Sequence, residues 1–276
     1  MGREWLDQLP ALVHAQCRHW GLRIDGDVLH GSNALVVPVR GAAGPAALRL
    51  APPGDDVGAQ ANALTWWAGR GAVLLLDVDL DARAMLLERL SQTRSLTSEP
   101  LAVAIPVIAE LVRELAVPAP PDAPATRAIA ADLVSTLDRD WSALGGPTPR
   151  THLDTARDLA DQLSRAGPAD AAVNGDLHCG QVLAGARAPW LVVDPVLLRG
   201  DPEYDFGRVL WTRLDELPTI SAIEAAFDDF VQAAEVPPAR ARKWVVVRSM
   251  SYLLWGLQRG LTWDPPKCRR LLDAFC

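Results

Sequence analysis

The stretch AAVNGDLHCGQVLAGARAPWLVVDP, residues 171–195, decides the fold class of this chain. It begins with a short strand-like run, turns at a Gly-Asp pair that contains Asp176, and ends with the apolar run WLVV followed directly by Asp194. Helical patterns lie on both sides of it, so the stretch is a strand-rich interruption of a helical region. A hairpin there would bring both carboxylates to one end.

Two neighbouring carboxylates are typical of phosphoryl-transfer chemistry. One can orient an attacking hydroxyl and accept its proton, and another can hold Mg²⁺ against nucleotide phosphates. Each aspartate alone also fits a plainer role, because Asp176 follows a glycine and Asp194 precedes a proline, where Asp commonly caps turns. The interval of 18 positions between them, with Gln181 five positions after Asp176, favours the phosphoryl-transfer interpretation.

Residues 22–90 predict strands around a single helix. The segments LRIDGDVL, ALVVPV and ALRL, with turns at residues 31–33 and 41–45, indicate an antiparallel meander. A helix is expected over residues 57–69, where the apolar side chains share one face and two glycines follow. The segment AVLLLDVDLDARAMLLERL predicts a hairpin of two buried strands.

Helical periodicity dominates beyond residue 90. We expect helices over residues 101–115, 125–144, 153–166, 204–216, 221–235, 239–260 and 266–276. Pro106 predicts that the first of them starts after this residue or is kinked there. The change of pattern near residues 90–97 predicts an α+β chain of two lobes, with residues 1–93 in the N-terminal lobe and residues 94–276 in a mainly helical lobe.

Composition excludes several classes of protein. No apolar run approaches the roughly 18–20 residues of a membrane span, and the first twenty residues lack the pattern of a signal peptide. The net charge of -7 and pI near 5.2 argue against a nucleic-acid partner and suit a cationic ligand. The four cysteines form no C-x-x-C pair, which predicts neither a zinc site nor a disulfide framework. A monomer in the reducing cytoplasm is expected.

On these motifs, the chain resembles the aminoglycoside phosphotransferase family, in its streptomycin 6-kinase branch. The similarity to the catalytic and metal loops of kinases lies in three features. They are the run GDLH, the amide of Gln181 after it and the interval to Asp194. Four further blocks resemble this branch too: ALTWWAGRGAVLLLDVD, MLLERL, DPVLLRGDPEYDFGRVLWTRLDEL and WVVVRSMSYLLWGLQRGLTWDPPKCRRLL. The resemblance therefore covers nearly the whole chain.

The resemblance implies a protein-kinase-like fold, with a small antiparallel-sheet N-lobe that binds nucleotide and a larger helical C-lobe for catalysis and substrate. It implies ATP and Mg²⁺ as cofactors. Asp176 would be the catalytic base, Gln181 and Asp194 the Mg²⁺ ligands, and Glu88 to Leu90 the hinge backbone that holds adenine.

Two positions near the phosphates differ from the family pattern. Arg49, in the run LRL, stands where the family places a phosphate-binding lysine, and Gln60 stands where a glutamate would pair with that lysine. A guanidinium at position 49 could bind phosphate with a different geometry, or it could face solvent from its strand.

The loops differ as well. The nucleotide-covering loop contains a single glycine, Gly31, with Ser32 beside it, instead of repeated glycines. Asn174 replaces the histidine that usually precedes Gly-Asp, and Gln181 replaces an asparagine, which lengthens the amide ligand by one methylene.

The triplet Asp205-Phe206-Gly207 spells the D-F-G motif of kinases, but it lies 29 residues past Asp176 at the start of a helical pattern. The resemblance assigns Asp205 a bracing role near the catalytic loop, where a carboxylate at a helix N-terminus accepts backbone N–H bonds. His178 is expected to pack or hydrogen-bond locally.

Other residues suit a cationic acceptor. Trp255 and Trp263 are candidates for lining its pocket. A group of acidic residues after the metal loop could contribute, although surface exposure explains most of them more simply: Asp201, Glu203, Asp215 and Glu216.

The sequence thus predicts an ATP- and Mg²⁺-dependent kinase for a hydroxyl of a small, polar, cationic natural product such as an aminoglycoside. Two alternatives remain open. The substituted positions also fit a kinase-like binding or regulatory protein without transfer activity, and the acceptor could instead be a sugar or another metabolite, because the fold does not fix the acceptor.

Overall fold

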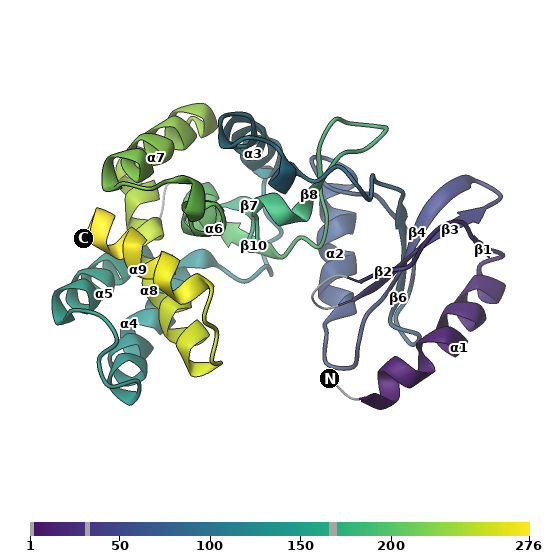
Figure 1. Cartoon of the computed structure of the whole chain (residues 1–276), viewed down its shortest axis with the longest axis horizontal. Helices are drawn as coiled ribbons and strands as arrows, with labels where there is room; N and C mark the ends of the chain where they lie inside the picture. Colours follow the sequence, from purple (N-terminus) through teal and green to yellow (C-terminus); the bar gives the residue numbers. More distant parts are fainter. Residues whose placement is uncertain (1–2, 31–33, 166–169) are drawn as a thin grey trace. The chain divides into compact units, whose positions relative to one another are not determined.

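The computed structural model describes residues 3–30, 34–165 and 170–276 (Figure 1). The chain forms two compact units. One comprises Met1–Arg94 with Leu183–Pro195, and the other comprises Ser95–Val182 with Val196–Cys276. The segment that carries Asp194 therefore packs with the N-terminal unit, whereas the loop that carries Asp176 belongs to the helical unit.

The first unit is built on an antiparallel sheet. Its strands are β1 (Arg23–Ile24), β2 (Leu29–His30), β3 (Leu35–Gly41), β4 (Gly44–Leu50), β5 (Leu75–Asp79) and β6 (Ala84–Glu88). The order is β1-β3-β4-β6-β5, with β2 paired to β3. This arrangement confirms the meander and the hairpin expected from the sequence. The expectation that both hairpin strands are buried is wrong for β5, none of whose residues is buried, because β5 lies at the edge of the sheet.

Helix α1 (Arg3–His19) contributes to the core of this unit. Its Val13 and Cys17 are buried against apolar side chains of β3 and β4, among them Val37 and Leu48. The sequence did not lead us to expect this helix, which contains a proline, Pro10, at an exposed interior position. Burial against the sheet stabilises a segment that local propensity alone predicts poorly.

Helix α2 (Val57–Trp67) confirms the helix expected over residues 57–69. The Asp56 side chain caps it by accepting a 2.9 Å hydrogen bond from the amide of Ala59. Ala68 ends it in the left-handed conformation at φ 47°.

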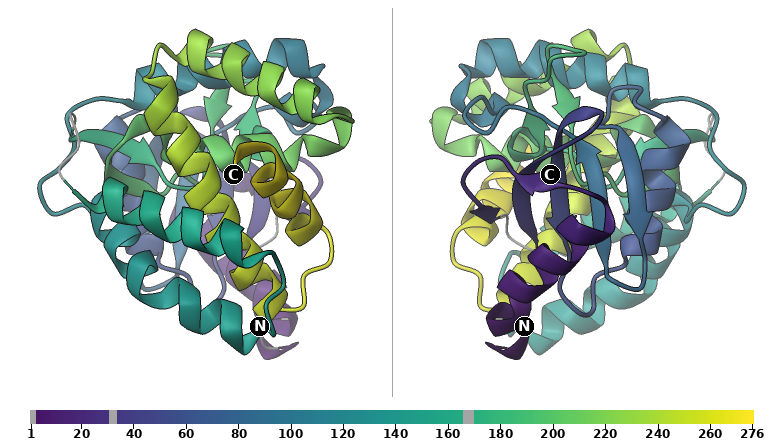
Figure 2. Two further views of the ribbon diagram at one scale, coloured as in Figure 1. Left: turned by 90° about the vertical axis from the view of Figure 1, so that its left-hand side faces the viewer. Right: turned by 90° about the vertical axis from the view of Figure 1, so that its right-hand side faces the viewer.

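The second unit contains most of the helices. They are α3 (Leu101–Leu115), α4 (Thr126–Ala143), α5 (Arg150–Ser164), α6 (Phe206–Thr212), α7 (Ile220–Ala234), α8 (Pro238–Gln258) and α9 (Asp264–Phe275). Helix α3 begins before Pro106 and continues through it, so it does not start after the proline. Helix α8 packs against α9 and against α4 and α5 (Figure 2, left). None of the described helices is long and apolar enough to cross a membrane.

The strand-rich stretch expected at residues 171–195 is present. Strand β7 (Ala171–Asn174) pairs antiparallel with β10 (Leu197–Gly200), and β8 (Val182–Leu183) pairs with β9 (Leu191–Val192). Val173 and Leu198 anchor the first pair in a core that includes Trp244. The pairing places the loop after β7 beside Val196, the residue directly before β10.

Gly200 is required where β10 ends. Its φ is 142°, and a Cβ there would lie 2.1 Å from Oγ1 of Thr126. We expect Gly200→Ala to lower the free energy of unfolding by about 2–3 kcal/mol, because the change adds a clash to backbone strain. Gly145→Ala, at φ 72° with open space around the new Cβ, is the control and should cost about 1 kcal/mol. Denaturant unfolding measures both, and equal losses would contradict the clash.

Candidate active site

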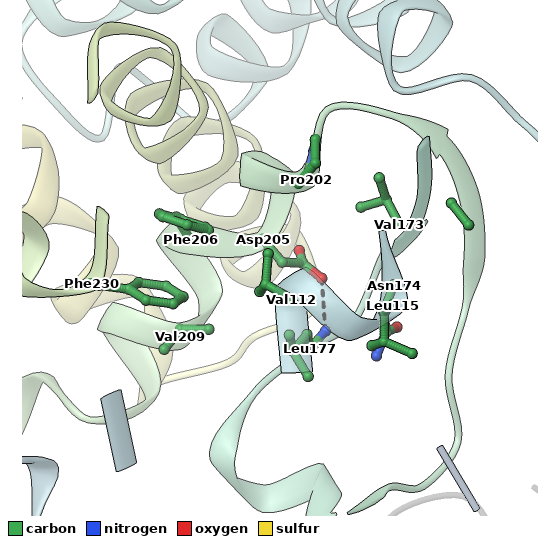
Figure 3. A pocket seen from close by; sticks show the side chains of 11 residues that line it. Val112, Leu115, Val173, Asn174, Leu177, Pro202, Asp205, Phe206, Val209 and Phe230 are labelled. Carbon is green, nitrogen blue, oxygen red and sulfur yellow. Dashed lines mark hydrogen bonds between the residues drawn. The ribbon is translucent and has the colours of Figure 1, made fainter. Parts of the chain in front are cut away.

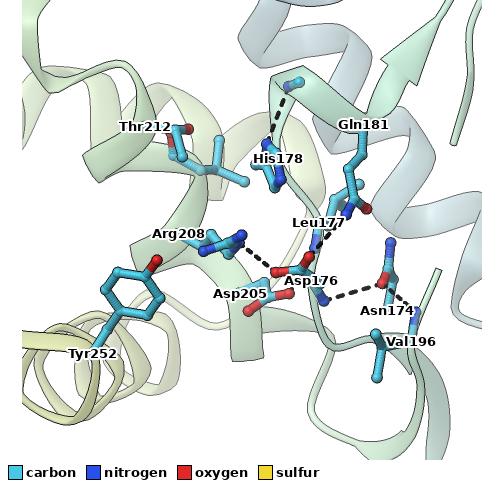
Figure 4. Close-up of polar contacts among 12 residues, drawn as sticks. Asn174, Asp176, Leu177, His178, Gln181, Val196, Asp205, Arg208, Thr212 and Tyr252 are labelled. Atoms are coloured by element: carbon cyan, nitrogen blue, oxygen red, sulfur yellow. Dashed lines mark hydrogen bonds and ion pairs between the residues drawn. The ribbon is translucent and has the colours of Figure 1, made fainter. Parts of the chain in front are cut away.

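The loop after β7 is held by the side chain of Asn174. Its Oδ1 accepts hydrogen bonds from the amide of Asp176 at 3.1 Å and from the amide of Val196 at 3.0 Å (Figure 4). The amide of Gly175 donates to the carbonyl of Val196 at 2.8 Å. Gly175 is needed because a Cβ there would lie 2.5 Å from Cδ1 of Leu198. The residue that departs from the family's histidine thus fixes the backbone of Asp176.

Both oxygens of Asp176 have partners. Oδ2 accepts a 2.8 Å hydrogen bond from Nε2 of Gln181, and Oδ1 lies 2.5 Å from Nε of Arg208 (Figure 4). The Arg208 contact is an ion pair rather than an aligned hydrogen bond, because no hydrogen-bond geometry is met at this Nε. The carboxylate is therefore oriented from two sides.

The surroundings of Asp176 raise the pKa of its carboxyl to about 6. Burial is the main cause, and the negative charge of Asp205 adds to it, while Arg208, Arg248 and the Gln181 hydrogen bond act in the opposite direction. At neutral pH the carboxylate is still the main form, and it is more basic than an ordinary aspartate. These are properties of a group that accepts a proton from a hydroxyl.

Asp205 braces this loop from the start of α6. Its Oδ2 accepts a 2.7 Å hydrogen bond from the amide of Leu177 (Figure 3). Its Oδ1 lies 3.0 Å from Nη2 of Arg248. The bracing role expected from the sequence is confirmed. The amide that Asp205 binds belongs to the Asp176 loop and not to the helix that Asp205 begins, because its side chain makes no cap bond to α6.

His178 has a local role, as expected. Its Nδ1 accepts a 3.2 Å hydrogen bond from the amide of Gly180. Burial, and then the charge of Arg208, lower the pKa of the imidazole to about 4. The ring is therefore neutral at physiological pH.

Gln181 has the atom that a Mg²⁺ ligand requires. Its Nε2 is used by Asp176, and its Oε1 is buried without a hydrogen-bond partner among the described residues. A buried carbonyl oxygen without a partner is costly, and a hard cation would satisfy it. The side chain thus fits the predicted metal role.

Arg49 and Asp194 meet within the first unit. Nε of Arg49 lies 2.9 Å from Oδ1 of Asp194, and Nη2 lies 3.9 Å from Asp55. Arg49 is only 2 % exposed, so the solvent-facing alternative for this residue is wrong. Asp194 follows β9 at φ 50° and keeps 40 % of its side chain exposed, which leaves room for a cation beside it. Among the described residues, no three His, Cys, Asp or Glu side chains gather as a preformed metal site.

The other predicted nucleotide residues lie in different surroundings. Gln60 is on α2, and its Oε1 is buried without a hydrogen-bond partner in the described part of the chain. Leu90 is buried just after β6. Gly31 and Ser32 lie outside the described residues.

Glu88, the last residue of β6, contributes its side chain to a clamp. Its Oε2 accepts hydrogen bonds from the amide of Leu74 at 3.1 Å and from Nη2 of Arg187 at 3.0 Å. Arg187 also donates to the carbonyls of Gly69 and Ala72 at 2.7 and 2.9 Å. The loop between β8 and β9 is thereby attached to the end of the predicted hinge.

Sequence reasoning missed three arginines of these sites, Arg187, Arg208 and Arg248. An arginine in a helix or loop has no motif of its own, and each becomes notable only through the carboxylate that it meets. For Arg208 the one available signal was its position, three residues after Asp205 and therefore nearly on the same helical face.

The acidic residues after the metal loop are engaged inside the second unit. Asp201 is buried and accepts hydrogen bonds from Arg240 at 2.7 Å and from Nε1 of Trp244 at 2.8 Å. Glu203 is 2 % exposed, and burial raises its pKa to about 7. Surface exposure was therefore the wrong explanation for this pair.

The two later acidic residues are exposed but paired. Asp215 lies 2.5 Å from Nζ of Lys267, and Glu216 pairs with Arg213. Both carboxylates are therefore already neutralised by a cationic side chain of the protein.

A small cavity lies under the Asp176 loop, lined by Asn174, Leu177, Asp205, Phe206 and Phe230 among others (Figure 3). It offers about 10 Å³, roughly the space of one water molecule. It cannot hold a sugar-sized acceptor.

An antiparallel N-terminal sheet, a helical C-terminal unit and a braced aspartate loop define this chain as a small-molecule phosphotransferase with a protein-kinase-like fold. The chain belongs to the aminoglycoside/hydroxyurea antibiotic resistance kinase family, whose model matches residues 19–260.

Named relatives agree with this assignment. The chain is 37% identical to streptomycin 6-kinase of Streptomyces griseus, over 99% of this chain and 91% of that protein. It is 35% identical to hydroxyurea phosphotransferase of Kitasatospora aureofaciens, over 94% and 76%.

Solved structures confirm the fold. The aminoglycoside phosphotransferase APH(4)-Ia aligns with a TM-score of 0.69 at 15% identity, over 97% of this chain and 99% of that one. Choline kinase LicA of Streptococcus pneumoniae aligns with a TM-score of 0.65 at 11% identity, over the same shares.

Proposed function

We propose that this protein transfers the γ-phosphoryl group of ATP to a hydroxyl of an aminoglycoside such as streptomycin. The acceptor oxygen forms a bond to phosphorus, the bond from phosphorus to the ADP oxygen breaks, and the hydroxyl proton passes to Asp176 and then to solvent. The observation that carries this proposal is the orientation and raised basicity of Asp176 between Gln181 and Arg208.

We assign the nucleotide to the N-terminal lobe, residues 1–93, and catalysis and acceptor binding to residues 94–276. Arg49 would bind the phosphates, with Gln60 as its hydrogen-bond partner in the nucleotide site and with Gly31 and Ser32 covering the phosphates. The backbone from Glu88 to Leu90 would bind the adenine. Support comes from the guanidinium of Arg49, a buried cation at the predicted phosphate position. Oε1 of Gln60, an acceptor without a hydrogen-bond partner among the described residues, suits an N–H donor such as that guanidinium.

Gln181 and Asp194 are the proposed Mg²⁺ ligands. When bound, the ion would neutralise charge on the phosphates. Oε1 of Gln181, without a hydrogen-bond partner in the part of the chain that the structure describes, and the partly exposed carboxylate of Asp194 fit a cation that prefers oxygen ligands. We place a monomeric enzyme in the cytoplasm, where ATP is available and thiols such as the free Cys17, Cys179, Cys268 and Cys276 stay reduced.

The first test is product formation. Purified protein with Mg²⁺ and ATP should convert streptomycin to a product heavier by one phosphate, detected by mass spectrometry. Hydroxyurea belongs in the same assay, since the name of one relative includes it. Product from hydroxyurea but not from streptomycin would move the acceptor to that class, and phosphorylation of neutral sugars alone would overturn the cationic acceptor.

One observation favours a second candidate, a kinase-like binding protein. Arg49 lies on Asp194 at a position that a Mg²⁺ ion would need to share. If the ion cannot bind there, transfer fails although the fold remains. Absence of both product and Mg²⁺-dependent ATP binding would establish this second candidate.

Asp194→Asn is expected to raise the Mg²⁺ concentration for half-maximal activity by at least about tenfold, since it removes an anionic ligand. The measurement is the initial rate against Mg²⁺ at saturating ATP. Asp81→Asn, at an exposed position of the same unit, is the control and should leave this concentration unchanged. An unchanged value in the Asp194 variant would remove Asp194 from the metal site.

A further inference from the structure

Two arginine–aspartate ion pairs lie at the Asp176 loop. Arg208 lies 2.5 Å from Asp176, and Arg248 lies 3.0 Å from Asp205 (Figure 4 shows the first pair). Each arginine thus contacts a different carboxylate. Arg248 pairs with Asp205, so the cation in direct contact with Asp176 among the described residues is Arg208.

The guanidinium of Arg208 is itself held in place. It lies 5.5 Å from the ring centre of Tyr252 and 5.9 Å from that of Trp211, and these two rings stack at 4.7 Å. The hydroxyl of Tyr252 donates to Oδ2 of Asp264 at 3.2 Å, which fixes the tyrosine. Trp211 is fully buried. Arg208 therefore pays little additional conformational entropy when it contacts Asp176.

The contacts of Asp176 leave its carboxylate little freedom. Its amide is bound by Asn174, its Oδ2 by Gln181 and its Oδ1 by Arg208, from three different elements. The remaining lone pairs of the two oxygens are then directed in a fixed plane. For proton acceptance in a transfer reaction, a displacement of about 1 Å costs roughly 10²-fold in rate.

We infer that Arg208 is a positioning residue, which holds the carboxylate of Asp176 in the orientation for the acceptor hydroxyl without contacting the substrate itself. The inference rests on the proposed function for its effect on rate. The contact between the two side chains can be tested without any activity.

The activity test removes the guanidinium and then supplies it from solution. Arg208→Ala is expected to lower kcat about 10²-fold, with the KM values for ATP and acceptor within about threefold. Guanidinium at millimolar concentration should restore kcat at least about tenfold by entering the space beside Tyr252. Arg208→Lys retains the charge but loses the planar group, so its kcat should lie between those of the parent and of Arg208→Ala.

Arg150→Ala is the matched control. Its guanidinium also lies over a ring, that of Trp141, at 5.6 Å, and pairs with a carboxylate, Asp154, but it is exposed on α5. We expect normal kcat and no response to guanidinium. Any of three results for Arg208→Ala would overturn the positioning role. They are a kcat within twofold of the parent, a defect that raises KM instead of lowering kcat, and no increase in kcat with guanidinium.

A double-mutant cycle in denaturant tests the contact without activity. The unfolding equilibrium constant is measured for Arg208→Gln, for Asp176→Asn and for the double variant. The constant of the double variant should differ at least about fivefold from the value expected if the two single substitutions acted independently. Independent effects would overturn the inference even if the enzyme is active. Coupling in a protein that transfers no phosphate would support the contact and reject the proposed function. If Arg208→Ala does not fold, Arg208→Lys carries the kinetic test.

Discussion

Asp176→Asn should lower the rate of phosphoryl transfer by about 10²–10⁴-fold, the usual contribution of a positioned proton acceptor. The amide retains nearly the shape of the carboxylate, so Gln181 and Asn174 can keep the loop in place. It cannot accept the hydroxyl proton. ATP affinity should change less than about threefold, because the residue acts on the acceptor side of the reaction.

Initial rates of product formation and calorimetric titration with ATP measure the two effects. Asp228→Asn, on the exposed side of α7, is the matched control and should be fully active. Since Asp176 neutralises Arg208, the unfolding of each variant should also be followed to exclude a loss of folded protein. An Asp176→Asn enzyme with more than about a tenth of the parent rate would assign proton acceptance to another group.

The second large effect concerns stability. Arg248→Met should lower the free energy of unfolding by about 3–5 kcal/mol, because it leaves the buried carboxylate of Asp205 without its ionic partner. Asp205 is 4 % exposed, and burial already raises its pKa against the effect of Arg248. Denaturant unfolding at neutral pH gives the value.

The sign of its pH dependence follows from linkage. A carboxyl whose folded pKa is raised costs stability above its unfolded pKa, near 3.8, since the unfolded chain loses the proton first. The penalty in Arg248→Met should therefore shrink as the pH falls towards 4. The double variant Asp205→Asn/Arg248→Met should recover most of the loss, because asparagine can still accept the bond from Leu177. The guanidinium of Arg248 also lies 4.3 Å from the ring centre of Tyr204. If the double variant is no more stable than Arg248→Met, the loss comes from this packing and not from charge.

Much of the fold was predictable from local patterns. The helix over residues 57–69, the hairpin that follows and the long helices of the second unit were expected from hydrophobic period, caps and turn residues, which depend on neighbouring positions. Helix α1 and the passage of α3 through Pro106 were not, because each depends on packing or backbone accommodation that local patterns do not encode.

For the candidate site, the sequence determined the residue types and their spacing, and through them the family: the Asp176 loop, the amide at Gln181 and the aspartate after WLVV. Only the tertiary structure decided which groups they meet. Arg208 on Asp176, Arg248 on Asp205 and Arg49 on Asp194 join residues 32 to 145 positions apart. Charge pairing depends on distance and burial in space, and a linear pattern of residues records neither.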